Sequence, residues 1–270
     1  MIDPYEGEKS IYSMYGALQV GSTPNYIRIK DLQVPFNQEN SPGLDATVRF
    51  ENLESETVTI LEDTVVSFSG NVTHNYIVHE SIQPREKYRI TAERPDGATV
   101  QTMATGPHVT EVVAEPAEDV DCEQQIEFTF KNVPAPEQVV MDVGFFHEDK
   151  MQWNQVSLVD QLKRIENTDQ FYISLSPRNL LVEVFTPSLE GEEGGRPIPP
   201  RFLFPTVKCH ELQSDVAQIR YTHFGPEWEA VEPIYPVNPD DIMDVENGLG
   251  FIGVYRQDSF TITIDQSPPE

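Results

Sequence analysis

Short alternating segments separated by turn residues fill the first hundred residues, and they constrain the fold more than any other feature. About seven such segments, rich in Val, Ile, Thr and Tyr, occur before residue 106. In "YRITAE", Tyr88 and Ile90 share one face while Arg89 and Thr91 share the other, as in a strand with one buried side. The separators "STPN", "NSPG", "QPRE" and "RPDG" are typical of turns. The pattern predicts a mainly β chain with an immunoglobulin- or fibronectin-like β-sandwich over 11–107, after a lead-in over 1–10.

The rest of the chain predicts a second β-rich domain over 108–270 with one or two short helices. Apolar residues at three-residue steps predict a helix over 154–167. A second helix is predicted over 214–223, where Ser214 can accept a hydrogen bond from a free amide of the first turn. The segment 180–186, "LLVEVFT", is rich in β-branched and aromatic residues and predicts a strand.

The charge of the chain is strongly one-sided. Asp and Glu number 45 against 18 Lys and Arg, which gives a formal net charge of -27. Such a surface repels phosphate backbones and anionic membranes, so nucleic-acid binding is not expected. The favoured interpretation is an acidic surface suited to salty, halophilic surroundings. A plain soluble extracytoplasmic protein and a dedicated divalent-cation binder are the alternatives.

The two cysteines, Cys122 and Cys209, are far apart in sequence and match no zinc-binding pattern. His210 follows Cys209 directly, but adjacent residues of a strand point to opposite faces, which argues against a thiol–imidazole pair. Two interpretations stay open. The cysteines are either buried free thiols or, in an oxidising compartment, partners in a disulfide.

The segment "GLGFIG", residues 248–253, has the glycine spacing of a dinucleotide-binding loop. That motif needs a strand before the glycines, a helix after them and an acidic residue about 20 positions later. Here three prolines precede the glycines, and the following "FIGVYRQDSFTITID" is poor in helix formers. We therefore expect no nucleotide cofactor and assign these glycines to a terminal β-element, where they allow a bulge or a close backbone approach.

An acidic cluster just before these glycines suggests calcium as an alternative cofactor. An EF-hand is excluded, because with Gly248 at the turn position Met243 and Val254 would occupy the first and last ligand positions. An irregular calcium site and a solvated loop that enters a hairpin through Asn247-Gly248 remain as alternatives. The candidate metal ligands are Asp240, Asp241, Asp244 and Glu246.

Aromatic residues in the second half provide candidate ligand contacts. Trp153, Trp228 and Tyr235 can form a platform on which sugar rings stack, although core packing explains each of them as well. The hydrolase motifs G-x-S-x-G and H-E-x-x-H are absent from the sequence. We therefore predict a protein that is not an enzyme and assign no catalytic residue.

Two features bear on the cellular location. No apolar run approaches the roughly 20 residues that cross a bilayer. The start, "MIDPYEGEKSIYSMYG", has no apolar core of a signal peptide. A cytoplasmic protein and an exported protein whose signal has been removed are both consistent with this.

Several segments, taken in order, resemble a known family. They are "YSMYGALQVGSTPNYIRIKDL", "ATVRFENLESE", "IQPREKYRITAERPDGATVQT" and "PVNPDDIMDVENGLGFIGVY". Together they are similar to a Bacteroidota cell-envelope lipoprotein family of unknown function. The resemblance implies export, a lipid anchor on an amino-terminal cysteine that this sequence does not carry, and genes beside those of TonB-dependent receptors. It implies no catalytic residues.

These observations lead to one functional hypothesis and two alternatives. We expect a non-catalytic protein of the cell envelope, periplasmic or at the cell surface, that binds a partner protein or acts as a scaffold at the outer membrane. A TonB-dependent receptor is a candidate partner, and membrane contact is expected only through a lipid anchor. The alternatives are a secreted glycan-active enzyme or carbohydrate-binding module, and a structural subunit of a surface assembly.

Overall fold

The computed structural model describes residues 11–32, 44–68, 71–133, 139–156, 158, 161–185, 207–230 and 245–267. The chain divides into two compact units. Unit 1 consists of Met1–His108 and Phe224–Arg256, and unit 2 consists of Val109–His223 and Gln257–Glu270. The sequence placed everything after residue 107 in the second domain, whereas Phe224–Arg256 returns to the first. Among the described residues, no helix is long and apolar enough to span a membrane.

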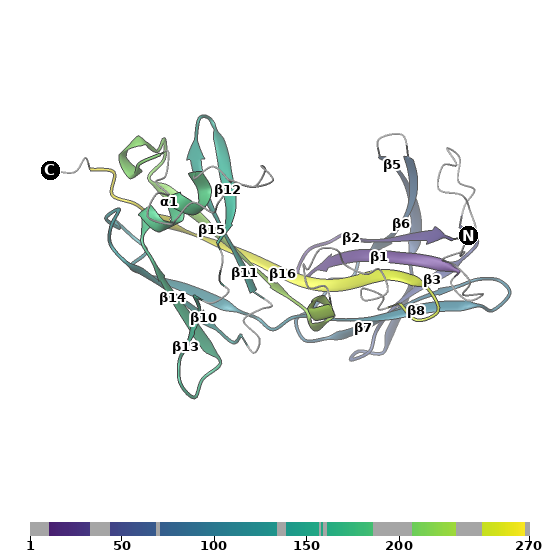
Figure 1. The fold of residues 1–270 in the computed structure, drawn as a ribbon. Helices are drawn as coiled ribbons and strands as arrows, with labels where there is room; N and C mark the ends of the chain where they lie inside the picture. The colour runs from purple at the N-terminus through teal and green to yellow at the C-terminus, as the bar shows by residue number, and fades with distance from the viewer. Residues whose placement is uncertain are drawn as a thin grey trace, which may run out of the picture. The chain divides into compact units, whose positions relative to one another are not determined.

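Unit 1 contains two sheets (Figure 1). The first has the order β16-β1-β2-β6-β5, made of the first part of β16 (Leu249–Thr263), β1 (Tyr12–Gln19), β2 (Asn25–Asp31), β6 (Asn71–Val78) and β5 (Glu62–Phe68). The second has the order β4-β3-β7-β8, made of β4 (Thr57–Ile60), β3 (Thr47–Asn52), β7 (Lys87–Glu93) and β8 (Thr99–Thr105). Every pair within these sheets is antiparallel except β1 with β16, which is parallel.

The alternation read from the sequence determines which side chains fill the core of unit 1. Along β2, Ile27 and Ile29 are buried while Tyr26 and Arg28 are exposed. The inward residues of both sheets form one apolar cluster. Within it, the rings of Phe50 and Tyr88 stack with centroids 5.1 Å apart. Two sheets around one core confirm the predicted immunoglobulin-like sandwich.

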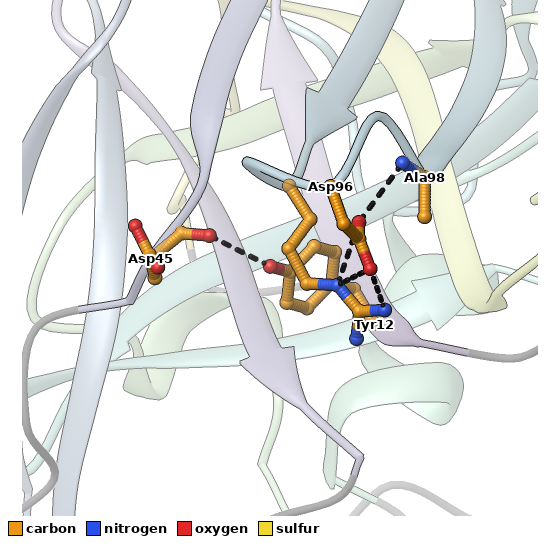
Figure 2. Close-up of polar contacts among 5 residues, drawn as sticks. Tyr12, Asp45, Asp96 and Ala98 are labelled. Carbon is orange, nitrogen blue, oxygen red and sulfur yellow. Dashed lines mark hydrogen bonds and ion pairs between the residues drawn. The ribbon is translucent and has the colours of Figure 1, made fainter.

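The turn sequence "RPDG" closes the β7–β8 hairpin beside Tyr12 (Figure 2). Asp96 accepts hydrogen bonds from Nε of Arg94 at 3.0 Å and from the backbone amide of Ala98 at 3.1 Å. The bonds from Arg94 and then from Ala98 lower the pKa of Asp96 to about 2. The hydroxyl of Tyr12 donates to the carbonyl of Asp45 at 3.0 Å, which ties β1 to the segment before β3.

Unit 2 also contains two sheets (Figure 1). One has the order β12-β11-β15-β16, made of β12 (Lys150–Val156), β11 (Val139–His147), β15 (Val216–Phe224) and the last part of β16. The other has the order β13-β14-β10-β9, made of β13 (Lys163–Arg164), β14 (Gln170–Leu175), β10 (Ile126–Lys131) and β9 (Glu111–Glu115). One α-helix, α1 (Pro177–Phe185), and the 3-10 turn η3 (Cys209–Glu211) pack against this core. The prediction of a β-rich second half with a short helix is confirmed.

The positions of the helices were predicted wrongly. The range 154–167 holds the end of β12 and the short strand β13, and 214–223 forms most of β15. In β15 the buried side chains of Ala217, Ile219 and Tyr221 alternate with more exposed ones, which is the period of a strand.

The segment predicted as a strand, 180–186, instead holds most of α1. Leu180 and Leu181 are both buried, and adjacent buried residues fit a helix better than a one-sided strand. Ser176 accepts a hydrogen bond from the amide of Asn179 at 3.3 Å, and Pro177 occupies the first turn. Ser followed by Pro is a helix-start signal that the sequence interpretation missed.

A disulfide joins Cys122 and Cys209 within unit 2. The two Cα atoms are 6.1 Å apart and the residues are separated by 87 positions. Cys209 lies in η3, and the carbonyl of Cys122 accepts a hydrogen bond from the amide of Arg178 at the start of α1. The bond therefore ties the β9–β10 connection to the segment that follows α1, and of the two alternatives the structure contains the disulfide.

Reduction of this disulfide should destabilise unit 2. A closed loop of 87 residues corresponds to roughly 4 to 5 kcal/mol in the chain-entropy treatment, and measured values are about 2 to 4 kcal/mol. We expect Cys122→Ser/Cys209→Ser to unfold at lower urea concentration than the oxidised wild type. Two reactive thiols in the native, unreduced protein would contradict this assignment.

Buried tyrosines should make unit 1 sensitive to alkali. Burial raises the pKa of Tyr88 to about 12. The pKa values of Tyr76 and Tyr12 are also raised, mainly by burial. A folded-state pKa above the unfolded value near 10 gives stability that is complete below pH 10 and is lost as the pH rises toward 12. We expect the free energy of unfolding to fall over this window, and Tyr88→Phe to reduce the slope. A slope identical in wild type and Tyr88→Phe would contradict a contribution from Tyr88.

Candidate functional site

Most of the predicted metal ligands lie outside the described residues, as does Tyr235. They are Asp240, Asp241 and Asp244. Glu246 is described and exposed. Its backbone exchanges two hydrogen bonds with Gln101 of β8, and its carboxylate accepts a third from the side chain of Gln101. Within the described ranges, no three His, Cys, Asp or Glu side chains gather in an arrangement that would hold a metal ion. Calcium binding at this cluster stays a prediction.

The glycines of "GLGFIG" serve the backbone of unit 1. Gly250 has a φ of +119°, and a Cβ there would lie 2.9 Å from the carbonyl carbon of Met14 and closer still to its oxygen. This close approach lets the start of β16 pair in parallel with β1. Gly250 and Gly253 thus lie in a strand that continues to Thr263, and Gly248 directly precedes it, in keeping with the prediction of a terminal β-element. Asn247 takes a positive φ of 59°, but the predicted hairpin through Asn247-Gly248 is not formed by the described residues: Glu246 bridges to Gln101 of β8, and Leu249 pairs with Ser13 of β1.

Replacing Gly250 should destabilise unit 1 for two reasons. A valine would be strained at this φ, by about 1 to 3 kcal/mol, and would also collide with the backbone of Met14. Gly21 is a matched control, since its φ is +72° but nothing lies within 4 Å of a Cβ placed there. We expect Gly250→Val to lower the melting temperature more than Gly21→Val. Equal losses would mean that the contact with Met14 contributes nothing.

Both tryptophans lie over glycines on the sheets. In unit 2, a Cβ on Gly144 of β11 would meet Cδ2 of Trp153 at 2.8 Å, because the two residues are directly paired across β11 and β12. In unit 1, a Cβ on Gly253 of β16 would meet Cε2 of Trp228 at 2.7 Å. The indole N–H of Trp228 also donates to the carbonyl of Val254 at 3.0 Å. Because glycine has no side chain, each indole can lie directly over the strand at that position.

The Trp153 ring already interacts with a neighbouring side chain of unit 2. The guanidinium carbon of Arg220 lies 4.4 Å from the centre of the Trp153 ring, within cation–π range. Arg220 also bonds Asp142 through Nε at 3.1 Å and Nη2 at 3.0 Å. Trp153 keeps 36% of its surface exposed. Trp228 belongs to unit 1, so the predicted stacking platform is not assembled within either unit.

An outward face rich in aromatic residues covers the first sheet of unit 1. In the parallel β1–β16 pair, Met14, Leu18, Ile252 and Val254 are buried in the core. The alternating positions therefore point outward. Tyr26 and Arg28 of β2 and two rings at the end of β15 and just after it, which pack on β16, complete what we call the aromatic face. Its members are Tyr15, Tyr26, Arg28, Phe224, Trp228, Phe251 and Tyr255.

The aromatic face is packed at one side and open at the other. Trp228 lies 4.8 Å from both Phe224 and Phe251 between ring centres. Tyr15 and Tyr26, in contrast, expose 52% and 49% of their surface. Exposed tyrosine rings beside a packed aromatic cluster are the composition found at the energetic centres of binding interfaces.

Arg28 lies at this open side. It is the cross-strand partner of Tyr15 and stands two residues after Tyr26 on the same face of β2. Its side chain is exposed and makes no ion pair with any described residue. Its other cross-strand neighbour, Asn75, donates to the carbonyl and hydroxyl of Thr73. A guanidinium thus stands beside two accessible rings, and no carboxylate of the described residues pairs with it.

The opposite outward face of the same sandwich is built differently. There Arg49 bonds Glu93, and Arg89 bonds Glu51 at 3.1 Å. Both arginines of this face therefore have a carboxylate partner on a neighbouring strand, while Lys87, also exposed there, makes no ion pair with a described residue. The exposed rings of the aromatic face, together with Arg28, which makes no ion pair with a described residue, identify this face as the candidate functional site.

The sequence interpretation named one member of this site, Trp228, and missed Tyr15, Tyr26 and Arg28. A signal was available for two of them. In "NYIRIKDL" the isoleucines occupy one parity, so Tyr26 and Arg28 must share the solvent side. A large aromatic residue on the polar side of an amphipathic strand is unusual enough to mark a surface for binding.

Comparison with known proteins adds little to these observations. No protein-family model matches the chain, and no curated protein sequence matches it. Among solved structures, a pullulanase from Anoxybacillus sp. LM18-11 has 8% identity and a TM-score of 0.23, with 79% of this chain and 24% of that chain covered. The titin immunoglobulin tandem domains A164-A165 have 10% identity and a TM-score of 0.21, with 96% and 94% covered. Similarities this low identify neither a family nor an activity.

Proposed function

We propose that this chain is a non-catalytic binding protein of the cell envelope, and that the aromatic face of unit 1 contacts its ligand. The observation that carries the proposal is the exposure of Tyr15 and Tyr26 beside Arg28, which makes no ion pair within the described ranges. Tyr, Trp and Arg are the residues that most often dominate binding energy at protein surfaces. Rings fixed on strands also lose little conformational freedom when a ligand binds.

The disulfide supports an envelope location. Bonds of this kind form and persist in oxidising compartments and are rare in the cytosol. The pair Cys122–Cys209 is enclosed in unit 2, with Cys209 buried, so it has a structural role. Export to the periplasm or the cell surface accounts for this pair, and the acidic composition accords with salty surroundings.

The ligand in this proposal is an outer-membrane partner or a glycan of the envelope. A TonB-dependent receptor is the partner that the family resemblance suggests. Carbohydrate binding is the second candidate, and the observation that favours it is the placement of Tyr15 and Tyr26 as exposed rings on a sheet surface. A role as an assembly subunit would use the same face to bind another component of the surface structure.

Removal of the exposed rings should abolish binding without unfolding the protein. We expect Tyr15→Ala/Tyr26→Ala to bind immobilised native envelope components at least tenfold more weakly than wild type, because loss of a dominant interface residue costs about 2 kcal/mol or more. The matched control is Val58→Ala/Met103→Ala, which removes exposed apolar side chains from the opposite outward face.

The readout is retention of envelope proteins and glycans on each immobilised variant, with melting temperatures measured in parallel. Equal retention by wild type and Tyr15→Ala/Tyr26→Ala would refute the assignment of the aromatic face. So would an equal loss in the control variant, because binding would then not depend on this face.

A further inference from the structure

We infer that Tyr15, Tyr26 and Arg28 form a subsite for a saccharide that carries a carboxylate, such as a uronic acid residue. The tyrosine rings stack on the apolar faces of sugar rings, and the guanidinium of Arg28 pairs with the carboxylate. The inference rests on the proposed binding function and specifies its ligand class.

The register of β1 and β2 brings the three side chains together. Tyr15 and Arg28 are directly opposite in an antiparallel pair, where Cβ atoms are about 5 Å apart. Tyr26 precedes Arg28 by two residues on the same face, roughly 7 Å along the strand. The separations match the size of one or two sugar units, so one short saccharide can contact all three.

Arg28 differs from most described arginines, because it makes no ion pair with a described residue. Six of the described arginines bond a carboxylate: Arg49, Arg89, Arg94, Arg164, Arg178 and Arg220. With 45 acidic residues in the chain, a partner is readily found. The cross-strand neighbours of Arg28, Tyr15 and Asn75, are uncharged. A carboxylate on the same face, Glu62 of β5, lies two strands away and two residues along, roughly 12 Å.

This arrangement predicts a carboxylate as the recognised group. An arginine presents its N–H groups in a planar fork that matches both oxygens of a carboxylate. The net charge of -27 disfavours a densely charged polyanion at long range. At physiological salt, screening over about 8 Å removes most of that repulsion for a ligand with few charges. A sugar chain with widely spaced carboxylates meets both conditions.

The neighbouring side chains favour a saccharide over a protein surface. The centre of a protein–protein interface is apolar and excludes water. The most exposed aliphatic side chains of unit 1, Val58, Ile60 and Val65, instead lie on β4 and β5. Around Arg28 the accessible groups are tyrosine rings with hydroxyls, which suit a ligand with apolar ring faces and a hydroxylated rim.

The test uses matched saccharides and a matched arginine variant. The probes are tetrasaccharides of hyaluronan and alginate and sialyllactose, each compared with its carboxyl methyl ester, and binding is measured by calorimetry on the full chain. The variants are Arg28→Met and Tyr15→Ala. Arg85→Met is the control, because Arg85 is also exposed and makes no ion pair with a described residue, but lies in the β6–β7 connection.

We expect wild type and Arg85→Met to bind at least one acidic probe at least tenfold more tightly than its methyl ester. Arg28→Met should lose this preference while keeping its melting temperature, and Tyr15→Ala should weaken binding of acid and ester alike. The inference is overturned if no acidic probe binds, if esters bind equally well, or if Arg28→Met behaves as wild type.

The failure of this inference can be told apart from failure of the proposed function. If no saccharide binds but retention of envelope proteins still requires Tyr15 and Tyr26, the face binds a protein partner and the saccharide subsite is wrong. If neither depends on these tyrosines, the proposed function falls as well.

Discussion

The parallel pairing of the last strand with the first is the constraint on which the rest of unit 1 depends. β16 pairs with β1 over seven residue pairs, from Leu249 to Tyr255, and places Ile252 and Val254 in the core. Each fully buried side chain of this size contributes about 1.5 to 3 kcal/mol. The pairing requires Gly250, where any Cβ would collide with the backbone of Met14. A chain ending near residue 107 would lack these contacts, so the fold of unit 1 is complete only when β16 is present.

The same strand links the architecture to the candidate site. Its outward residues bring Phe251, Gly253 and Tyr255 beside β1, and Gly253 leaves the space that Trp228 occupies. Trp228 in turn packs on Phe224 and Phe251, which makes one side of the aromatic face rigid. Tyr15 and Tyr26 stand at the open side on strands already fixed by the core. Rigid support of exposed rings is what a binding surface needs, since little entropy is then lost on association.

Sequence alone predicted the parts of this structure that depend on local periodicity. The alternation in β2, β3 and β7 correctly predicted the sandwich. In contrast, the segment of α1 was predicted as a strand and the segment of β15 as a helix. In α1 the decisive signal was the Ser176-Pro177 start, and in β15 it was the alternation of Ala217 and Ile219. The β1–β16 pairing and the Cys122–Cys209 bond join residues far apart in sequence. Neither produces a repeating pattern in the sequence from which it could be predicted. The solvent side of Tyr26 and Arg28 was readable, but the uncharged neighbours of Arg28 become known only from the strand register.

The excess of acidic residues in the chain makes it informative that Arg28 has no ion pair with a described residue. Carboxylates outnumber cations by 45 to 18, and six described arginines have a carboxylate partner, whereas Arg28, whose strand neighbours are neutral, has none among the described residues. An exposed ion pair contributes little to stability, about 0 to 1 kcal/mol, so leaving Arg28 unpaired costs the fold almost nothing. A guanidinium already bound to a carboxylate, as Arg220 is to Asp142, would have to give up that bond before engaging a ligand. Arg28 has no such bond to a described residue, and its interaction with an incoming carboxylate is therefore available to binding.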